Sequence, residues 1–407
     1  MNIYYIITFF FVLISSKANF LFINDIYWIV FELILLFLCF EQKKIKLRDA
    51  RVLLLFTVGY LLLIMVRNLY NKLSFDYIES DILYLIKYIL VTYLFCAYLK
   101  GRAIKYLVKV ITDLAIISLL FYAIQITLGG KAILTIGKAI QGFLPPIPRS
   151  DEYTNFLFYT YNEKHYFRNS GFSWEPGAYG CFLIIGILLH LFNENFKVDK
   201  KLKILLIALL TTLSTTAYAA FFLILFMFYR VKGGKVNFGI VVLLIIVLVL
   251  IYQVPFLGDK ITDIYSSDLA DYNELDKLNK YYINAERQIP LNRFASILFV
   301  YYTFGLKMIM GISNEYKDLY VSKYNVNLSN GIMDFCAKFG LVGFIYLLNR
   351  FAKFCKLFLR KGEYVFYCIL ILVSISFGET ILILPFFIMF IFLYHFEKND
   401  LYYYPGS

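Results

Sequence analysis

Long apolar runs recur along the whole chain, separated by short polar or basic stretches. A helix that crosses lipid needs roughly 20 mostly apolar residues, and fewer where neighbouring helices cover its ends. Unpaired backbone groups are not tolerated in hydrocarbon, so each run is predicted to be a helix, and none shows the two-residue alternation of a barrel strand. The twelve predicted spans are residues 3–15, 27–40, 52–66, 82–99, 104–128, 177–193, 203–213, 216–229, 237–254, 331–349, 363–378 and 380–395.

The composition agrees with this pattern. Of the 407 residues, 61% are hydrophobic and 17% are charged, whereas a soluble domain is usually about half apolar and about a quarter charged. This excludes a soluble enzyme, a secreted disulfide scaffold and a disordered chain. We therefore predict an all-α polytopic membrane protein, with residues 1–407 forming a single integral membrane domain.

The basic residues indicate how the spans are oriented. One set of connections, together with the C-terminal segment, holds 21 basic and 7 acidic residues; these are residues 41–51, 100–105, 194–203, 230–236, 350–363 and 396–407. The connections on the opposite side hold 16 basic and 17 acidic residues; these are residues 16–26, 67–81, 129–176 and 255–330. Lys and Arg gather on the cytoplasmic side, so the first set is predicted to lie inside the cell together with both termini. The net charge of +12 therefore comes from the inner side, where it can attract anionic lipid heads, and this argues against nucleic acid as a partner.

Two segments required a choice. Residues 203–229 are apolar enough for one long helix, but a turn at Leu213-Ser214-Thr215-Thr216 keeps the following basic residues inside. Residues 294–310 are also apolar enough to cross. A crossing there would place the basic segment 350–361 outside, so we predict a membrane-surface or membrane-dipping helix instead.

Two predicted outer loops are much longer than the other connections: residues 129–176 and residues 255–330. Long loops on one side of a helical bundle usually carry function. The six cysteines all lie in or beside predicted spans, so we expect no disulfide framework in these loops.

The first of these loops ends with Arg168 and with Glu175-Pro176-Gly177 at a helix start. A carboxylate there can be an ordinary cap, because the positive end of a helix stabilises its charge by about 0.3–1 kcal/mol. Arg168, seven residues earlier, favours a functional interpretation, since an arginine can bind a phosphate through two parallel hydrogen bonds.

The second loop contributes Arg287 and Arg293 before the apolar segment 294–310, and Ser329-Asn330 before the tenth span. Arginines at a lipid interface are often only structural. The chain has no metal-ligand spacing, no Walker loop and no GxSxG turn. We therefore expect chemistry that needs neither a metal nor a nucleotide, and no cofactor.

The order of these motifs resembles Wzy-type O-antigen and capsular polysaccharide polymerases. Arg168-x-x-Gly171-x-x-x-Glu175-Pro176 leads into a span, Leu213-Ser214-Thr215-Thr216 breaks an apolar hairpin, and Arg293 precedes an apolar segment that ends at Gly311. Ser329-Asn330 then leads into a span with Gly340-x-x-Gly343. The resemblance covers about residues 168–345. It departs from the family at Gly311-Ile-Ser313, where a glycine pair is usual.

The resemblance implies a GT-C-like fold and a glycosyltransferase of the cytoplasmic membrane. Such a polymerase transfers a growing glycan from undecaprenyl pyrophosphate to the next lipid-linked repeat unit on the outer face, and its partners are these glycans, membrane lipid and a chain-length regulator protein. On this hypothesis Arg168 and Arg293 are catalytic with Glu175 as acceptor base. The predicted substrate-binding residues are Arg287, Asn330, Ser329, Trp174, Tyr166 and His165.

Three alternatives stay open, and one of them is a non-catalytic membrane scaffold whose long loops would recruit partners. An O-antigen ligase-type transferase shares the superfamily, but the ligase histidine near the end of the second loop is replaced here by Ser329 or Asn330. A non-enzymatic flippase or transporter of lipid-linked oligosaccharides would use charges inside the spans, for which Lys87, Lys109 and Asp113 are candidates.

Overall fold

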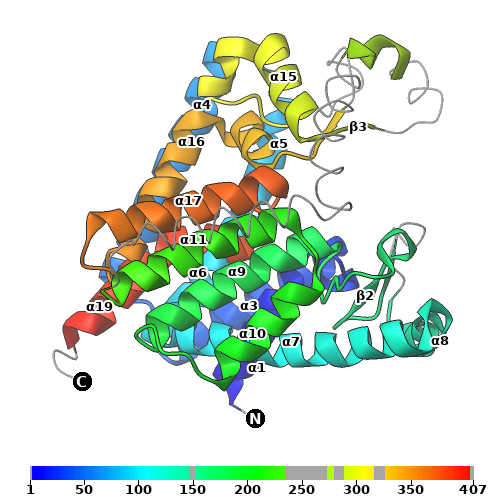
Figure 1. The fold of residues 1–407 in the computed structure, drawn as a ribbon. Helices are drawn as coiled ribbons and strands as arrows, with labels where there is room; N and C mark the ends of the chain where they lie inside the picture. The colour runs from blue at the N-terminus through cyan, green and yellow to red at the C-terminus, as the bar shows by residue number, and fades with distance from the viewer. Residues whose placement is uncertain (1, 146–152, 234–272, 279–287, 316–325, 404–407) are drawn as a thin grey trace.

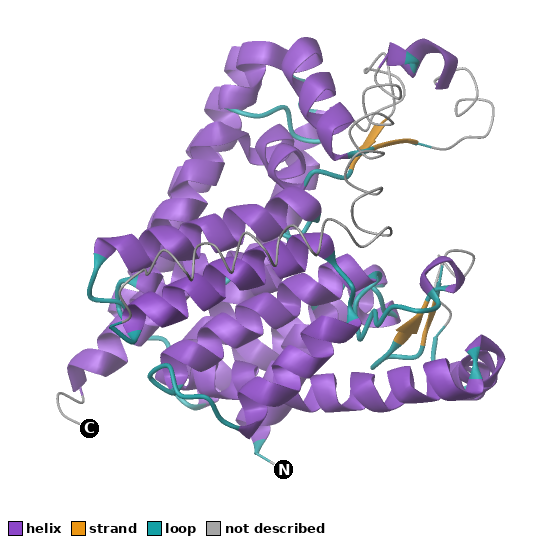
Figure 2. Ribbon diagram, viewed as in Figure 1, coloured by secondary structure: helices purple, strands orange, loops and turns teal. Residues whose placement is uncertain are grey.

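The computed structural model describes residues 2–145, 153–233, 273–278, 288–315 and 326–403, and most of these residues are helical (Figures 1 and 2). Before the first long loop the elements are α1 (Ile3–Ile14), α2 (Phe20–Ile23), α3 (Asp25–Glu41), α4 (Leu47–Asn71), α5 (Asp76–Tyr84), the π-helix Leu85–Leu90, α6 (Val91–Leu99), a 3-10 turn (Lys100–Arg102) and α7 (Ala103–Leu128).

The first long loop and the hairpins after it contribute α8 (Gly130–Gln141), β1 (Thr154–Asn155), β2 (Thr160–Tyr161), a 3-10 turn (Glu163–His165), α9 (Pro176–Asn193), α10 (Lys200–Thr211) and α11 (Thr215–Val231). The last third of the chain contributes β3 (Ile289–Leu291), α15 (Arg293–Phe304), a 3-10 helix (Gly305–Ile309), β4 (Val326–Leu328), α16 (Gly331–Cys355), α17 (Gly362–Gly378), α18 (Pro385–Ile388) and α19 (Phe390–Tyr403).

Four helical stretches among the described residues are long and apolar enough to cross a membrane: Leu47–Asn71, Asp76–Leu128, Pro176–Asn193 and Gly331–Cys355. The second of them is bent at Lys100, whose φ is +50°, so it forms two arms. Shorter apolar helices are Ile3–Ile14, Thr215–Val231 and Gly362–Gly378. The all-α fold predicted from the sequence is therefore confirmed, and it has the helices of a membrane-embedded protein.

Helix α9 is the centre of the bundle. Every residue from Pro176 to Phe192 is buried, and the helix packs against α7, α10 and α11. An all-apolar helix enclosed in this way can be polar only at its ends. Polar functional side chains can therefore lie only at the ends of α9.

Each predicted apolar run in the described residues contains a helix, although the last run becomes helical only at Pro385. The run 237–254 lies outside the described residues. The predicted break between the seventh and eighth runs is confirmed, because α10 ends at Thr211, Leu213 has φ +46° and Ser214 caps α11. The segment 294–310 is helical as predicted, whereas its position relative to a membrane stays a prediction.

The two long loops both carry small sheets. Strands β1 and β2 pair antiparallel, and β3 and β4 pair in parallel. In Figure 1 both sheets lie on the right, beside the ends of the bundle helices. We call this side of the molecule the loop end, and the candidate site lies here.

Candidate active site

Four helix ends meet around Glu379, which lies in the turn after α17. A Cβ atom added to Gly177 at the start of α9 would overlap the Glu379 Oε1 atom, and one added to Gly331 at the start of α16 would overlap the Glu379 carbonyl. Gly378 packs in the same way against Thr216 at the start of α11. The start of α9 thus meets the Glu379 carboxyl group, the start of α16 meets its backbone carbonyl, and the start of α11 meets the preceding Gly378.

Glu175 is the second carboxyl group of this site. It precedes α9 as the N-cap residue, with Pro176 at the first helical position, but its side chain makes no capping hydrogen bond. Instead Oε1 accepts a hydrogen bond of 2.7 Å from the Trp174 indole N–H, and the carboxyl group is hydrogen-bonded to that of Glu379. The Glu175 carboxyl group thus binds neighbouring side chains and does not cap α9.

The environment favours the neutral form of Glu379. Burial raises the pKa of Glu379 well above its usual value of 4.5, and the adjacent Glu175 raises it further, while Arg293 and Arg168 oppose the shift. Two carboxyl groups in contact cannot both ionise readily, because like charges repel and the site excludes water. The contact between the two carboxyl groups therefore favours the protonated form of Glu379.

Arg168 supplies the first guanidinium group. It is 8% exposed, and its Nε–H donates a 3.0 Å hydrogen bond to the Thr212 carbonyl at the C-terminal end of α10. Burial lowers the pKa of Arg168, and the carboxyl groups of Glu175 and Glu379 raise it. An arginine at a helix C-terminus satisfies a free carbonyl and interacts favourably with the dipole.

Two side chains hold the loop that carries Arg168. The Gln125 amide of α7 donates to the carbonyls of Tyr166 and Arg168, and the fully buried Asn169 binds Thr211 through its backbone N–H and its side-chain amide. Since α7 and α10 both belong to the bundle, these bonds fix Arg168 relative to α9.

Arg293 supplies the second guanidinium group from the other long loop. Its Nε–H donates a 3.1 Å hydrogen bond to the carbonyl of Gly378, the last residue of α17, and its Nη2 lies 3.8 Å from the Glu379 Oε1 atom. Two residues that we predicted to bind substrate support it. Asn330 donates from its side chain to the Arg293 carbonyl, and Ser329 donates to the Leu291 carbonyl.

The two arginines are anchored alike, although they come from different loops. Each uses its Nε–H for a carbonyl at the end of a helix, and no hydrogen bond from an Nη atom of either is found within the described part of the chain. Two guanidinium groups thus share the site with the carboxyl pair. Planar donors in this arrangement suit a phosphate or diphosphate group.

The other predicted site residues have different surroundings. Trp174 binds Glu175, and the Lys17 Nζ atom lies 5.2 Å from its ring centroid. Tyr166 is 62% exposed, with its ring edge-on to Phe167, and His165 ends the preceding 3-10 turn. Asn330 is fully buried and caps α16, accepting from the N–H groups of Ile332 and Met333. Arg287 lies outside the described residues.

The charges that favoured a transporter are engaged in contacts between helices. Lys87 forms an ion pair with Asp25, and Asp113 accepts a 2.9 Å hydrogen bond from the Tyr5 hydroxyl. Lys109 lies 5.0 Å from the centroid of the same Tyr5 ring. These contacts explain the three charges by pairing between neighbouring helices.

Sequence reasoning missed Glu379. The available signal is a carboxylate in the turn between two apolar runs, 363–378 and 380–395, where a charge is costly unless it has a partner. Its partners lie about 90 and 200 residues away in the chain, so spacing could not reveal them.

In the described residues no group of three or more His, Cys, Asp or Glu side chains is arranged to hold a metal ion. Comparison of the chain with protein-family models, with curated proteins and with solved structures gave no match. The functional assignment therefore depends on the geometry of the site and on the resemblance of its motifs.

Proposed function

We propose that this protein is a membrane glycosyltransferase that polymerises polyprenyl-diphosphate-linked oligosaccharide repeat units into a surface polysaccharide. One observation carries the proposal: Arg168 and Arg293, from two separate loops, interact electrostatically with the same pair of carboxyl groups. Anion donors and a candidate base in one place are what transfer from a diphosphate leaving group requires.

In the reaction that we propose, the hydroxyl oxygen of the acceptor unit bonds to the anomeric carbon of the donor glycan. The bond from that carbon to the diphosphate oxygen breaks, and its electron pair leaves with the diphosphate. Arg168 and Arg293 neutralise the charge that develops there. The acceptor proton passes to Glu175, and Glu379 holds Glu175 in place through the hydrogen bond between them.

The membrane arrangement belongs to the same proposal. Twelve crossings with both termini in the cytoplasm would place the loop end on the outer face of the cytoplasmic membrane. Nucleotides are absent there, so the donor must arrive already activated on a lipid. Undecaprenyl-pyrophosphate-linked glycans, membrane lipid and a chain-length regulator protein are the proposed partners. The GT-C-like architecture stays a prediction.

The test is to delete the gene and to run the surface glycans of complemented cells on a gel. We expect the wild-type protein to restore a ladder of chain lengths, and Arg168→Ala and Arg293→Ala to leave only the single-repeat glycolipid. Arg230→Ala is the matched control, because Arg230 pairs with Glu363 away from the site. A normal ladder from either site variant would contradict the proposal.

The same gel separates the alternatives. Complete polymer that stays on its lipid carrier in the deletion strain indicates a ligase. Repeat units that accumulate on the cytosolic leaflet indicate a flippase. Neither outcome is compatible with the polymerase that we propose.

A further inference from the structure

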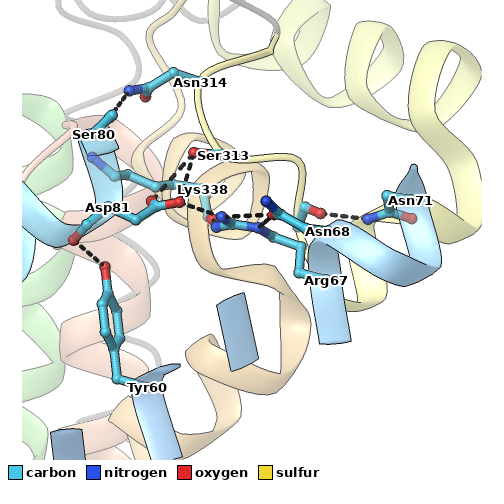
Figure 3. A network of polar contacts seen from close by, with 10 residues as sticks. Tyr60, Arg67, Asn68, Asn71, Ser80, Asp81, Ser313, Asn314 and Lys338 are labelled. Atoms are coloured by element: carbon cyan, nitrogen blue, oxygen red, sulfur yellow. Dashed lines mark hydrogen bonds and ion pairs between the residues drawn. The ribbon is translucent and has the colours of Figure 1, made fainter. Parts of the chain in front are cut away.

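A buried ion pair joins two helices that lie in the upper part of Figure 1, α4 and α5. It joins Arg67 near the end of α4 to Asp81 in α5 (Figure 3). We propose that this pair is the anchor that positions α15, and with it Arg293, against α16 and α17. The expected loss of activity rests on the proposed function, whereas the expected displacement of α15 does not.

The pair is enclosed by protein on all sides. Arg67 and Asp81 are 1% and 0% exposed. Arg67 also donates a 3.1 Å hydrogen bond to the Lys338 carbonyl of α16 and donates to the side chain of the adjacent Asn68. The Tyr60 hydroxyl donates to the Asp81 carbonyl. The ion pair therefore fastens α4, α5 and α16 together.

The same network holds the segment that follows α15. We call residues 305–314 the strap. Ser313 donates from its hydroxyl to the Asp81 carboxylate at 3.1–3.2 Å, and the Asn71 side chain donates to the carbonyls of Lys307 and Gly311. Asn314 binds Ser80 at 2.6 Å. Each of these bonds links the strap to α4 or α5.

The strap also contacts α16 directly, at a break in that helix. Gly340 has φ +75°, and Gly311 in the strap has φ +85°. A Cβ atom on Gly311 would lie 2.6 Å from the Gly340 nitrogen, so the two backbones touch. The Ile312 N–H donates to the Ala337 carbonyl at 2.6 Å. The break leaves the nearby Lys338 carbonyl free to bind Arg67.

These contacts form a closed frame. Helix α15 runs from Arg293 to the strap, the strap is fastened to α16, and α16 returns to Asn330, whose amide binds the Arg293 carbonyl. Arg67 and Asp81 lie where the strap, α4, α5 and α16 meet. Releasing the strap would free one end of α15, and the Arg293 guanidinium at the other end would lose its fixed relation to Glu379.

A buried ion pair is a poor means of stabilising a fold, because desolvation offsets the attraction between the charges. Two apolar residues of similar size usually replace such a pair without loss of stability. A pair that is retained between three helices and a strap can serve to fix their relative positions. An apolar replacement of the pair should therefore keep the stability of the fold and change the position of α15, which makes the inference testable.

The test uses the double variant Arg67→Met/Asp81→Leu in the full-length protein. Spin labels at Tyr301→Cys in α15 and Leu210→Cys in α10 report the position of α15, since both side chains are exposed and all six native cysteines are buried. We expect a folded protein with a shifted or broader distance distribution, and a polymer yield about 10²-fold lower. Arg230→Ala, which removes another interhelical ion pair, is expected to change neither readout.

Asn71→Ala is the second variant, in case the double variant does not fold. It removes the bonds to the Lys307 and Gly311 carbonyls and leaves the ion pair intact, and we expect the same displacement in weaker form. A wild-type distance distribution in a folded variant would overturn the inference, whatever the glycan gel shows. If wild-type protein fails to restore polymer, the proposed function fails, and the spin-label distances still decide the position of α15.

Discussion

The carboxyl groups of Glu175 and Glu379 are hydrogen-bonded to one another at the point where α9 begins and α17 ends. This contact joins the end of the first long loop to a turn near the C-terminus. Arg168 precedes Glu175 in the chain and Arg293 lies between Glu175 and Glu379, yet both arginines act on the same pair of carboxyl groups. The site is therefore a product of the tertiary fold.

Replacing Glu379 by Gln tests the protonation of this pair. The pKa of Glu379 is raised by burial, so the folded protein retains the proton at a pH where the unfolded chain has lost it. As the pH rises from 4.5 toward the folded pKa, the free energy of unfolding must fall, by about 1.4 kcal/mol for each unit of the shift. Glu379→Gln should remove this fall.

The measurement is thermal unfolding of the purified protein at pH 5 and at pH 8. We expect the wild-type melting temperature to drop more between these values than that of Glu379→Gln. Glu41→Gln at the exposed end of α3 is the control and should behave as the wild type. Equal drops in wild type and Glu379→Gln would show that Glu379 ionises normally.

Two glycines beside Glu379 should respond differently to substitution by Ala. At Gly177 the added Cβ meets the mobile end of the Glu379 side chain, so Gly177→Ala should fold and displace the carboxyl group. At Gly331 it meets backbone atoms of Ser376 and Glu379, which cannot move alone. Gly331→Ala should therefore lower the yield of folded protein.

The readouts are the size-exclusion profile and the glycan ladder. We expect Gly177→Ala to give a normal profile with a lost or shortened ladder, and Gly331→Ala to give a poor profile. Gly59→Ala in α4, where no atom lies within 4 Å of the added Cβ, is the control. A full ladder from Gly177→Ala would mean that the position of Glu379 is unimportant.

Asn330 has two functions that substitution can separate. Its Oδ1 atom caps α16, and its Nδ2 donates to the Arg293 carbonyl at 3.4 Å. Asn330→Ala removes both and should cost about 1 kcal/mol of stability. Asn330→Asp retains the cap and loses the donor.

We expect Asn330→Asp to melt within a few degrees of wild type and to make less polymer, because Arg293 is held less firmly. Melting temperature and glycan length are compared for the two variants. If Asn330→Asp is as active as wild type, Asn330 acts only as a cap and does not position Arg293.

Much of the helical framework could be predicted because hydrophobic runs report burial in lipid or protein directly. The turn at Leu213 and Ser214 could be predicted because a single span there would reverse the charge bias of later loops. Arg168, Glu175 and Arg293 could be chosen as candidates because each lies at the boundary between a loop and an apolar run.

Other features depend on contacts between distant residues. The predicted spans stop at residue 66 and resume at residue 82, but α4 extends to Asn71 and α5 begins at Asp76. Arg67 and Asp81 are tolerated inside helices because they pair with each other and with the strap. Asn330 looked like a donor for substrate, whereas its amide is used by α16 and Arg293.

The central claim is that Arg168 and Arg293 together hold a diphosphate beside the carboxyl pair. Its most direct test is the binding of a short-chain polyprenyl diphosphate to the protein in nanodiscs, with the corresponding monophosphate as comparison. Wild type should prefer the diphosphate, Arg168→Lys should lose most of that preference because an ammonium group cannot form two parallel hydrogen bonds, and Arg168→Ala/Arg293→Ala should lose it entirely. Unchanged diphosphate affinity in the double variant would contradict the account.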